Sequence, residues 1–205
     1  MKELSRLVVA LTLIATSAAL ILALAENATR APIAEQQRLR HRNAIAAVLP
    51  PFDNDPVQDA ITLSEAGTGS GQPQALTFYR ARRAGTLVGV AFNVTSPNGY
   101  SGDITLTVGV DAQERIIAIE ILSQAETPRL GARITQDSFT DQFQHRGLDN
   151  TDWRVKKDGG DIDQLTGATI SPRAVVSAVQ RGLASLHRHR EQIMTPREIT
   201  HELGN

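Results

Sequence analysis

A short run of small and hydroxyl-bearing residues has the composition of a phosphate-binding turn. Residues 163–169 read Asp-Gln-Leu-Thr-Gly-Ala-Thr, and Ser171 and Pro172 follow with the chemistry of an N-cap and a first helical position. A helix that starts there points free amides and the positive end of its dipole at a bound anion, and Gly167 and Ala168 let the anion come close. On these local signals alone, a plain turn before a capped helix is the favoured interpretation.

The predicted helix has one apolar face that must pack against the rest of a domain. Its apolar and small residues recur at spacings of three and four positions and are Ala174, Val175, Ala178, Val179, Gly182, Leu183 and Leu186. Such a stripe indicates a helix that lies on a core.

Upstream of this helix the hydrophobic period changes to two, which is the period of half-buried strands. Short turns separate successive strands, which predicts an antiparallel meander. The strands are predicted at 76–82, 88–94, 103–110 and 115–122, with a further strand at 153–156 and helices at 35–48 and 137–145. A sheet with flanking helices around one core is an α+β fold.

The N-terminus predicts a membrane anchor. Residues 7–25 are an uncharged apolar run that spans roughly 28 Å as a helix, close to the thickness of the hydrocarbon layer. Lys2 and Arg6 precede the run and Arg30 is the first cation after it, which favours a cytoplasmic N-terminus and an exported domain. A cleaved signal peptide is the alternative, although its apolar core is normally shorter.

Composition excludes several classes of function. The chain has 205 residues, a net charge of −1 and no cysteine. A charge so close to zero is not typical of nucleic-acid binding, and the absence of cysteine excludes disulfides and iron–sulfur clusters. The five histidines show no metal-ligand spacing, so no metal site is predicted.

Two irregular loops border the predicted strands. Residues 98–102 read Asn-Gly-Tyr-Ser-Gly, and residues 126–131 read Glu-Thr-Pro-Arg-Leu-Gly. Each alone is typical of a turn or connector. With residues 163–169 they form three motifs in the order found in one family, and the run at 153–161 adds a fourth similarity. The chain from about Gly99 to Arg181 thus resembles the FMN-binding domain of the G subunit of Rnf electron transport complexes.

The resemblance implies covalent FMN, joined to Thr169 through a phosphoester bond. A separate flavin transferase would attach it from FAD, with Asp163 as a recognition or metal-positioning residue during attachment. Glu126 or Thr127 would hydrogen-bond the flavin. The other implied cofactor contacts are Thr166, Gly167, Ala168, Tyr100, Ser101, Gly102, Leu130 and Gly131.

The sequence departs from the family pattern at three positions. Arg129 stands where glycine is usual, Asp103 where proline is common, and Thr166 where serine is often found. The exchange at Thr166 is conservative, whereas Arg129 is the one hint of a member that has lost its flavin.

The resemblance also implies a place in the cell and a function. The chain would be a single-pass protein of the bacterial inner membrane whose C-terminal domain faces the periplasm. With other membrane and soluble subunits it would form a complex that couples ferredoxin/NAD-type electron transfer to ion translocation. The chain itself would be a redox relay with no independent catalytic site. The alternatives are the C subunit of a sodium-translocating NADH:quinone reductase, which shares motif and cofactor, and an anchored non-redox assembly module.

These expectations divide the chain into five parts. They are a cytoplasmic N-terminus at 1–6, an anchor at 7–25, a helix and linker region at 26–75, an FMN-binding domain at 76–190 and a polar tail at 191–205.

Overall fold

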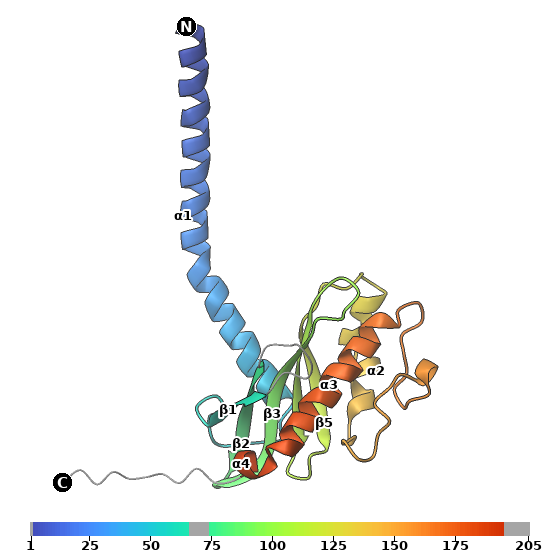
Figure 1. The fold of residues 1–205 in the computed structure, drawn as a ribbon. Coiled ribbons are helices and arrows are strands. Elements are labelled where there is room, and N and C mark those ends of the chain that lie inside the picture. The colour runs from blue at the N-terminus through green and yellow to red at the C-terminus, as the bar shows by residue number, and fades with distance from the viewer. Residues whose placement is uncertain (1, 66–73, 195–205) are drawn as a thin grey trace, which may run out of the picture. The chain divides into compact units, whose positions relative to one another are not determined.

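A five-stranded antiparallel sheet is the main element of the folded domain, and the computed structural model of the protein describes residues 2–65 and 74–194. The strands lie side by side in chain order, each paired with the next. Their bounds are β1 (Ala60–Glu65), β2 (Gln74–Arg83), β3 (Thr86–Ser96), β4 (Ile104–Asp111) and β5 (Ile116–Ser123). Figure 1 shows this meander with helices against it, and the predicted α+β class is confirmed.

The sheet contains one strand that the sequence analysis missed. β1 lies within the predicted helix and linker region, where Ile61 and Leu63 alternate with polar residues. The alternation covers only a few residues, which is too short to separate a strand from a loop. The other four strands agree with those predicted from periodicity.

The predicted strand at 153–156 is wrong. Only Val155 forms a bridge, a parallel one with Ile162, and a 3₁₀ turn η3 (Lys156–Asp158) follows it. Trp153 and Val155 are nevertheless buried and Arg154 is exposed. The alternation of apolar and polar residues therefore reflects alternate burial in a loop. In this loop Val155 bridges to Ile162, and the segment does not pair with a strand of the sheet.

One long helix contains the predicted anchor. α1 (Lys2–Ala47) includes the whole predicted anchor at 7–25. It also includes the predicted helix at 35–48 apart from Val48, and Pro32 lies inside it. Within the described part of the chain, it is the one helix whose length and apolar composition suffice to cross a membrane. The chain divides into two compact units, Met1–His41 and Arg42–Asn205, so the last turns of α1 belong to the second unit.

The last turns of α1 cover one face of the sheet. Ile45, Val48 and Leu49 pack against Ala81 and Ala91 in a small buried cluster. Small side chains on this face allow the backbone after α1 to approach the strands closely.

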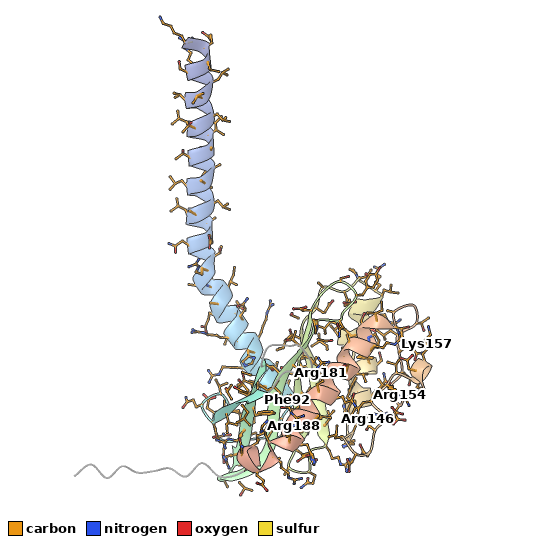
Figure 2. The ribbon with its side chains drawn as sticks, viewed as in Figure 1. Phe92, Arg146, Arg154, Lys157, Arg181 and Arg188 are labelled. Atoms are coloured by element: carbon orange, nitrogen blue, oxygen red, sulfur yellow. The ribbon has the colours of Figure 1, made fainter. Side chains whose placement is uncertain are left out.

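The opposite face carries the main core and the C-terminal helix α3 (Ile170–Arg188). Alternate residues of β3, Val90, Phe92 and Val94, point toward α3 because side chains alternate across a strand. The predicted apolar stripe of α3 is buried at all seven positions. Phe92 lies on the sheet beneath α3 (Figure 2), where it also contacts Phe78 with ring centroids 5.7 Å apart.

Short helical turns close the edge of this core beyond β5. They are η1 (Gly131–Thr135), α2 (Asp137–Thr140) and η2 (Asp141–Phe143), and α4 (Arg190–Met194) follows α3. Phe139 and Phe143 pack edge to face at 5.4 Å, and Phe143 stacks on Trp153 at 6.3 Å. The predicted short helix at 137–145 therefore exists as two consecutive turns. Of the predicted tail, residues 195–205 lie outside the described chain.

Gly182 sets how closely α3 lies on the sheet. A Cβ atom built on Gly182 would collide with the Phe92 ring and lie 2.8 Å from Val94 Cγ1. We expect Gly182→Ala to lower the free energy of unfolding by about 1–3 kcal/mol, because overpacking a core has this cost. Alanine would otherwise favour a helix by up to about 1 kcal/mol.

The measurement is urea denaturation of the full-length chain in detergent. Gln180→Ala, at an exposed position of the same helix, serves as the control and should stay within about 0.5 kcal/mol of the wild type. A stabilised Gly182→Ala protein would contradict the close packing.

Candidate functional site

The three sequence motifs meet at one end of the sheet. In an antiparallel meander, the loop between β3 and β4 and the segment after β5 leave the sheet at the same end. α3 begins at this end as well (Figure 1). A pocket of about 350 Å³ lies between them, lined by Tyr100, Glu126, Thr127, Leu130, Gly131, Gly167, Ala168, Thr169, Ile170 and Ser171.

Thr169 lies at the junction of this pocket with α3. It occupies the N-cap position with α-helical backbone angles, and its side chain makes no capping hydrogen bond. The turn before it is closed by a 3.0 Å hydrogen bond from the Ala168 amide to the Leu165 carbonyl. Gly167 has a φ of +81° in this turn, a backbone conformation that favours glycine. The turn therefore presents the Thr169 hydroxyl without a helix-capping role.

The helix start differs from the one predicted. α3 begins at Ile170, so Ser171 is not its N-cap and Pro172 is not its first residue. Ser171 is buried, and its hydroxyl donates a 2.5 Å hydrogen bond to Glu126 Oε2. The hydroxyl therefore donates to a carboxylate, whereas an N-cap hydroxyl accepts from a backbone amide, and sequence signals for capping do not reveal this difference. Pro172 still removes one amide from the first turn.

Exposed apolar side chains gather at the pocket. Tyr100 is 68% exposed, Ile170 45% and Leu130 40%, and all three line it. Ile170 was not among the predicted contacts, although its place directly after Thr169 was a signal available in the sequence. Apolar surface exposed beside a polar helix start is typical of a ligand site.

Four predicted contacts do not line the pocket. The Ser101 amide donates a 3.2 Å hydrogen bond to Glu126 Oε1, and Gly102 is its neighbour. Thr166 is exposed in the turn. Asp163 forms a 2.8 Å ion pair with Lys156, and its amide donates to Gln142 Oε1. Thr166 and Asp163 are therefore both exposed and outside the pocket lining.

The loop before the motif is tied to α3 by a charged pair. Arg173 donates two hydrogen bonds to Asp158, from Nε at 2.6 Å and from Nη2 at 2.5 Å. These hydrogen bonds hold the pKa of the Asp158 carboxyl below its ordinary value of 3.8. The pair links residues on both sides of the turn that carries Thr169.

Arg129 has an unusual backbone conformation. Its φ is +62°, in the left-handed region, where side chains other than glycine are strained. Its neighbour Leu130 lines the pocket. The departure from the usual glycine therefore carries a local backbone cost beside the pocket.

Comparisons with known proteins identify the family of this domain. Residues 99–184 match the FMN-binding domain family, a range that contains all three motifs apart from Asn98. The fold is also similar to the crystal structure of Shewanella oneidensis NqrC, with a TM-score of 0.50 and 18% identity over 69% of this chain and 74% of that chain. The chain thus contains a domain of the FMN-binding family, and the solved structure shares its fold.

Two relatives extend the similarity over most of the chain. The G subunit of the ion-translocating oxidoreductase complex of Cereibacter sphaeroides (strain ATCC 17023) is 41% identical over 185 residues, 87% of this chain and 82% of the relative. The corresponding protein of Pseudomonas aeruginosa (strain UCBPP-PA14) is 39% identical over 186 residues, 87% and 86% respectively. The chain belongs to the family of G subunits of ion-translocating oxidoreductase complexes.

Arg129→Gly tests the strain in the loop. We expect a free energy of unfolding within about 0.5 kcal/mol of the wild type. Relief of a left-handed conformation is worth about 1 kcal/mol, and the larger entropy of glycine in the unfolded chain offsets most of it. Arg133→Gly, in η1 and without a positive φ, is the control and should lose about 1 kcal/mol. Equal losses in the two variants, measured by urea denaturation, would contradict a strained Arg129.

Arg173→Gln tests the pair at the motif. Without the two hydrogen bonds we expect the pKa of Asp158 to rise toward 3.8, as measured by NMR titration of its carboxyl carbon. Because the folded-state pKa is the lower one, the pair stabilises the fold at neutral pH. This contribution is lost as the pH falls through the folded-state value. Arg181→Gln, elsewhere on α3, should leave the Asp158 titration unchanged.

Proposed function

We propose that this chain is a redox relay that carries FMN covalently on Thr169 within an ion-translocating oxidoreductase complex. The observation that carries the proposal is the pocket in which residues from all three motifs surround a threonine that has no capping role in its helix. Family membership supports a role in electron transport, and the FMN-binding domain match supports the cofactor.

The residues present fit the phosphate end of FMN. Thr169 precedes α3, whose first amides at Ile170 and Ser171 have no partner four residues earlier within the helix. Such amides, with the positive end of the helix dipole, favour a phosphate group. In transfer from FAD, Thr169 Oγ1 would form the ester bond to the phosphorus of the FMN half. The phosphoanhydride bond of FAD would break with AMP as the leaving group, and the threonine hydroxyl proton would be released.

The residues around the opening fit the flavin ring. Tyr100, Leu130 and Ile170 offer exposed apolar surface, and Thr127 adds a hydroxyl to the pocket lining. FMN, when bound, supplies the capacity to accept and donate electrons. The chain contributes orientation, with one side of the pocket left open to solvent for an electron-transfer partner.

The proposal extends to how the flavin is attached and how the chain is oriented in the membrane. A separate flavin transferase would attach the group at the turn before α3. Asp163, which is exposed and forms an ion pair with Lys156, would serve in recognition or in positioning a metal during attachment. α1 would cross the inner membrane once, with the FMN-binding domain in the periplasm. Electron exchange of the ferredoxin/NAD type would take place through the other subunits of the complex.

The test uses the full-length chain made together with its flavin transferase. In-gel fluorescence after denaturation should show flavin that migrates with the wild-type chain and with Thr169→Ser, and none with Thr169→Ala. Thr62→Ala, at an exposed threonine of β1 outside all three motifs, is the control and should keep the signal. Flavin that remains on Thr169→Ala, or a wild-type chain without flavin, would refute the assignment.

A further inference from the structure

Glu126 is a buried carboxylate that connects the three segments of the pocket. It belongs to the segment after β5, and only 5% of its surface is exposed. Its Oε1 accepts from the Ser101 amide of the β3–β4 loop at 3.2 Å. Its Oε2 accepts from the Ser171 hydroxyl at the start of α3 at 2.5 Å. Each oxygen thus fastens a different segment to the same side chain.

The backbone around Glu126 leaves room for this side chain and little else. A Cβ atom built on Gly99 would lie 2.7 Å from Glu126 Oε1, and one built on Gly131 would lie 2.6 Å from Glu126 Oε2. The same atom on Gly131 would also lie 2.6 Å from Ser171 Oγ. Two glycines, one in each loop motif, therefore lie directly against the carboxylate, and at Gly99 the Gly102 carbonyl, with which the built atom would collide, excludes a side chain as well.

Burying a carboxylate is expensive unless donors surround it. A leucine here would fill a similar space and bury apolar area at no such cost. Glu126 instead has an amide donor, a hydroxyl donor and a place near the positive end of α3. These donors indicate that the side chain of Glu126 holds the segments in place and does not merely fill space.

We infer that Glu126 is a positioning residue that assembles the flavin pocket before FMN is attached. This inference rests on the proposed function, and it assigns Glu126 a role different from a direct hydrogen bond to the flavin. Both carboxylate oxygens are already engaged within the protein. By holding Ser171 and the Ser101 loop together, Glu126 fixes the distance between Thr169 and the wall formed by Tyr100.

The first test needs no flavin. Hydrogen exchange is followed by mass spectrometry in full-length chain made without the transferase, in detergent. One reporter amide lies in each segment: the Ser101 amide bonds to Glu126 Oε1, the Ala132 amide to the Thr127 carbonyl, and the Ala168 amide to the Leu165 carbonyl. In Glu126→Ala and Glu126→Met we expect exchange at all three to become about tenfold faster or more, the effect of losing hydrogen bonds to a charged group.

The conservative variant separates positioning from space filling. Glu126→Gln can accept from the Ser101 amide and donate to Ser171 Oγ, so its exchange should stay close to that of the wild type. Glu120→Gln, exposed on β5, is the control and should change nothing. Wild-type protection in Glu126→Met, or faster exchange in only one of the three segments, would overturn the inference.

Ser171→Ala keeps the test decisive if the larger changes unfold the protein, which faster exchange in β3 and β4 would show. This variant removes the hydroxyl that donates to Glu126 Oε2. We expect faster exchange at the Ala168 and Ser101 amides while β3 and β4 stay protected. Unchanged exchange at both amides would overturn the inference.

A second readout follows attachment. With the transferase present, in-gel flavin fluorescence per chain should fall in Glu126→Met and remain in Glu126→Gln. Full flavin attachment in Glu126→Met, despite faster exchange, would overturn the role in assembling the pocket. If the exchange results are as expected and the wild-type chain carries no flavin, the proposed function is refuted. The role of Glu126 in holding the three segments together then remains supported.

Discussion

The packing of α3 on one face of the sheet is the constraint on which the site depends. Its apolar stripe is buried on β3 and β4, and Gly182 allows the helix to lie directly against Phe92. Because the helix is held along its length, its first residue is fixed at the end of the sheet. The loops of the meander leave at that same end, so Thr169 and the wall of the pocket are brought together by packing far from either.

The pocket combines exposed apolar side chains with polar groups that need hydrogen-bond partners. Three exposed apolar side chains face a helix start that favours anions, and a buried carboxylate joins the surrounding segments. Such an arrangement costs desolvation and strain, the latter at Arg129 with its positive φ. Proteins accept costs of this kind where geometry matters more than stability, as in a site for a bulky cofactor.

Much of the fold could be predicted from periodicity because burial on one face imposes it. The four longer strands and the stripe of α3 follow this rule, and the motifs of the site lie between elements predicted in this way. The rule failed at Trp153 and Val155, where alternate burial occurs without strand pairing. It was also too weak for β1, whose short alternation resembles a loop. Periodicity indicates which side chains are buried, but it does not show whether the segment pairs with another strand.

The sequence by itself determined an apolar N-terminal helix, an α+β domain and a small-residue turn before a helix, with Thr169 as the residue singled out by family resemblance. Only the tertiary structure decided that Ser171 bonds to Glu126 and does not cap its own helix, and that Ile170 joins the pocket. The physical reason is distance along the chain. Capping and periodicity are local and can be read from neighbours, whereas the Glu126 bridge joins residues 25 and 45 positions away, which only the folded sheet brings within reach.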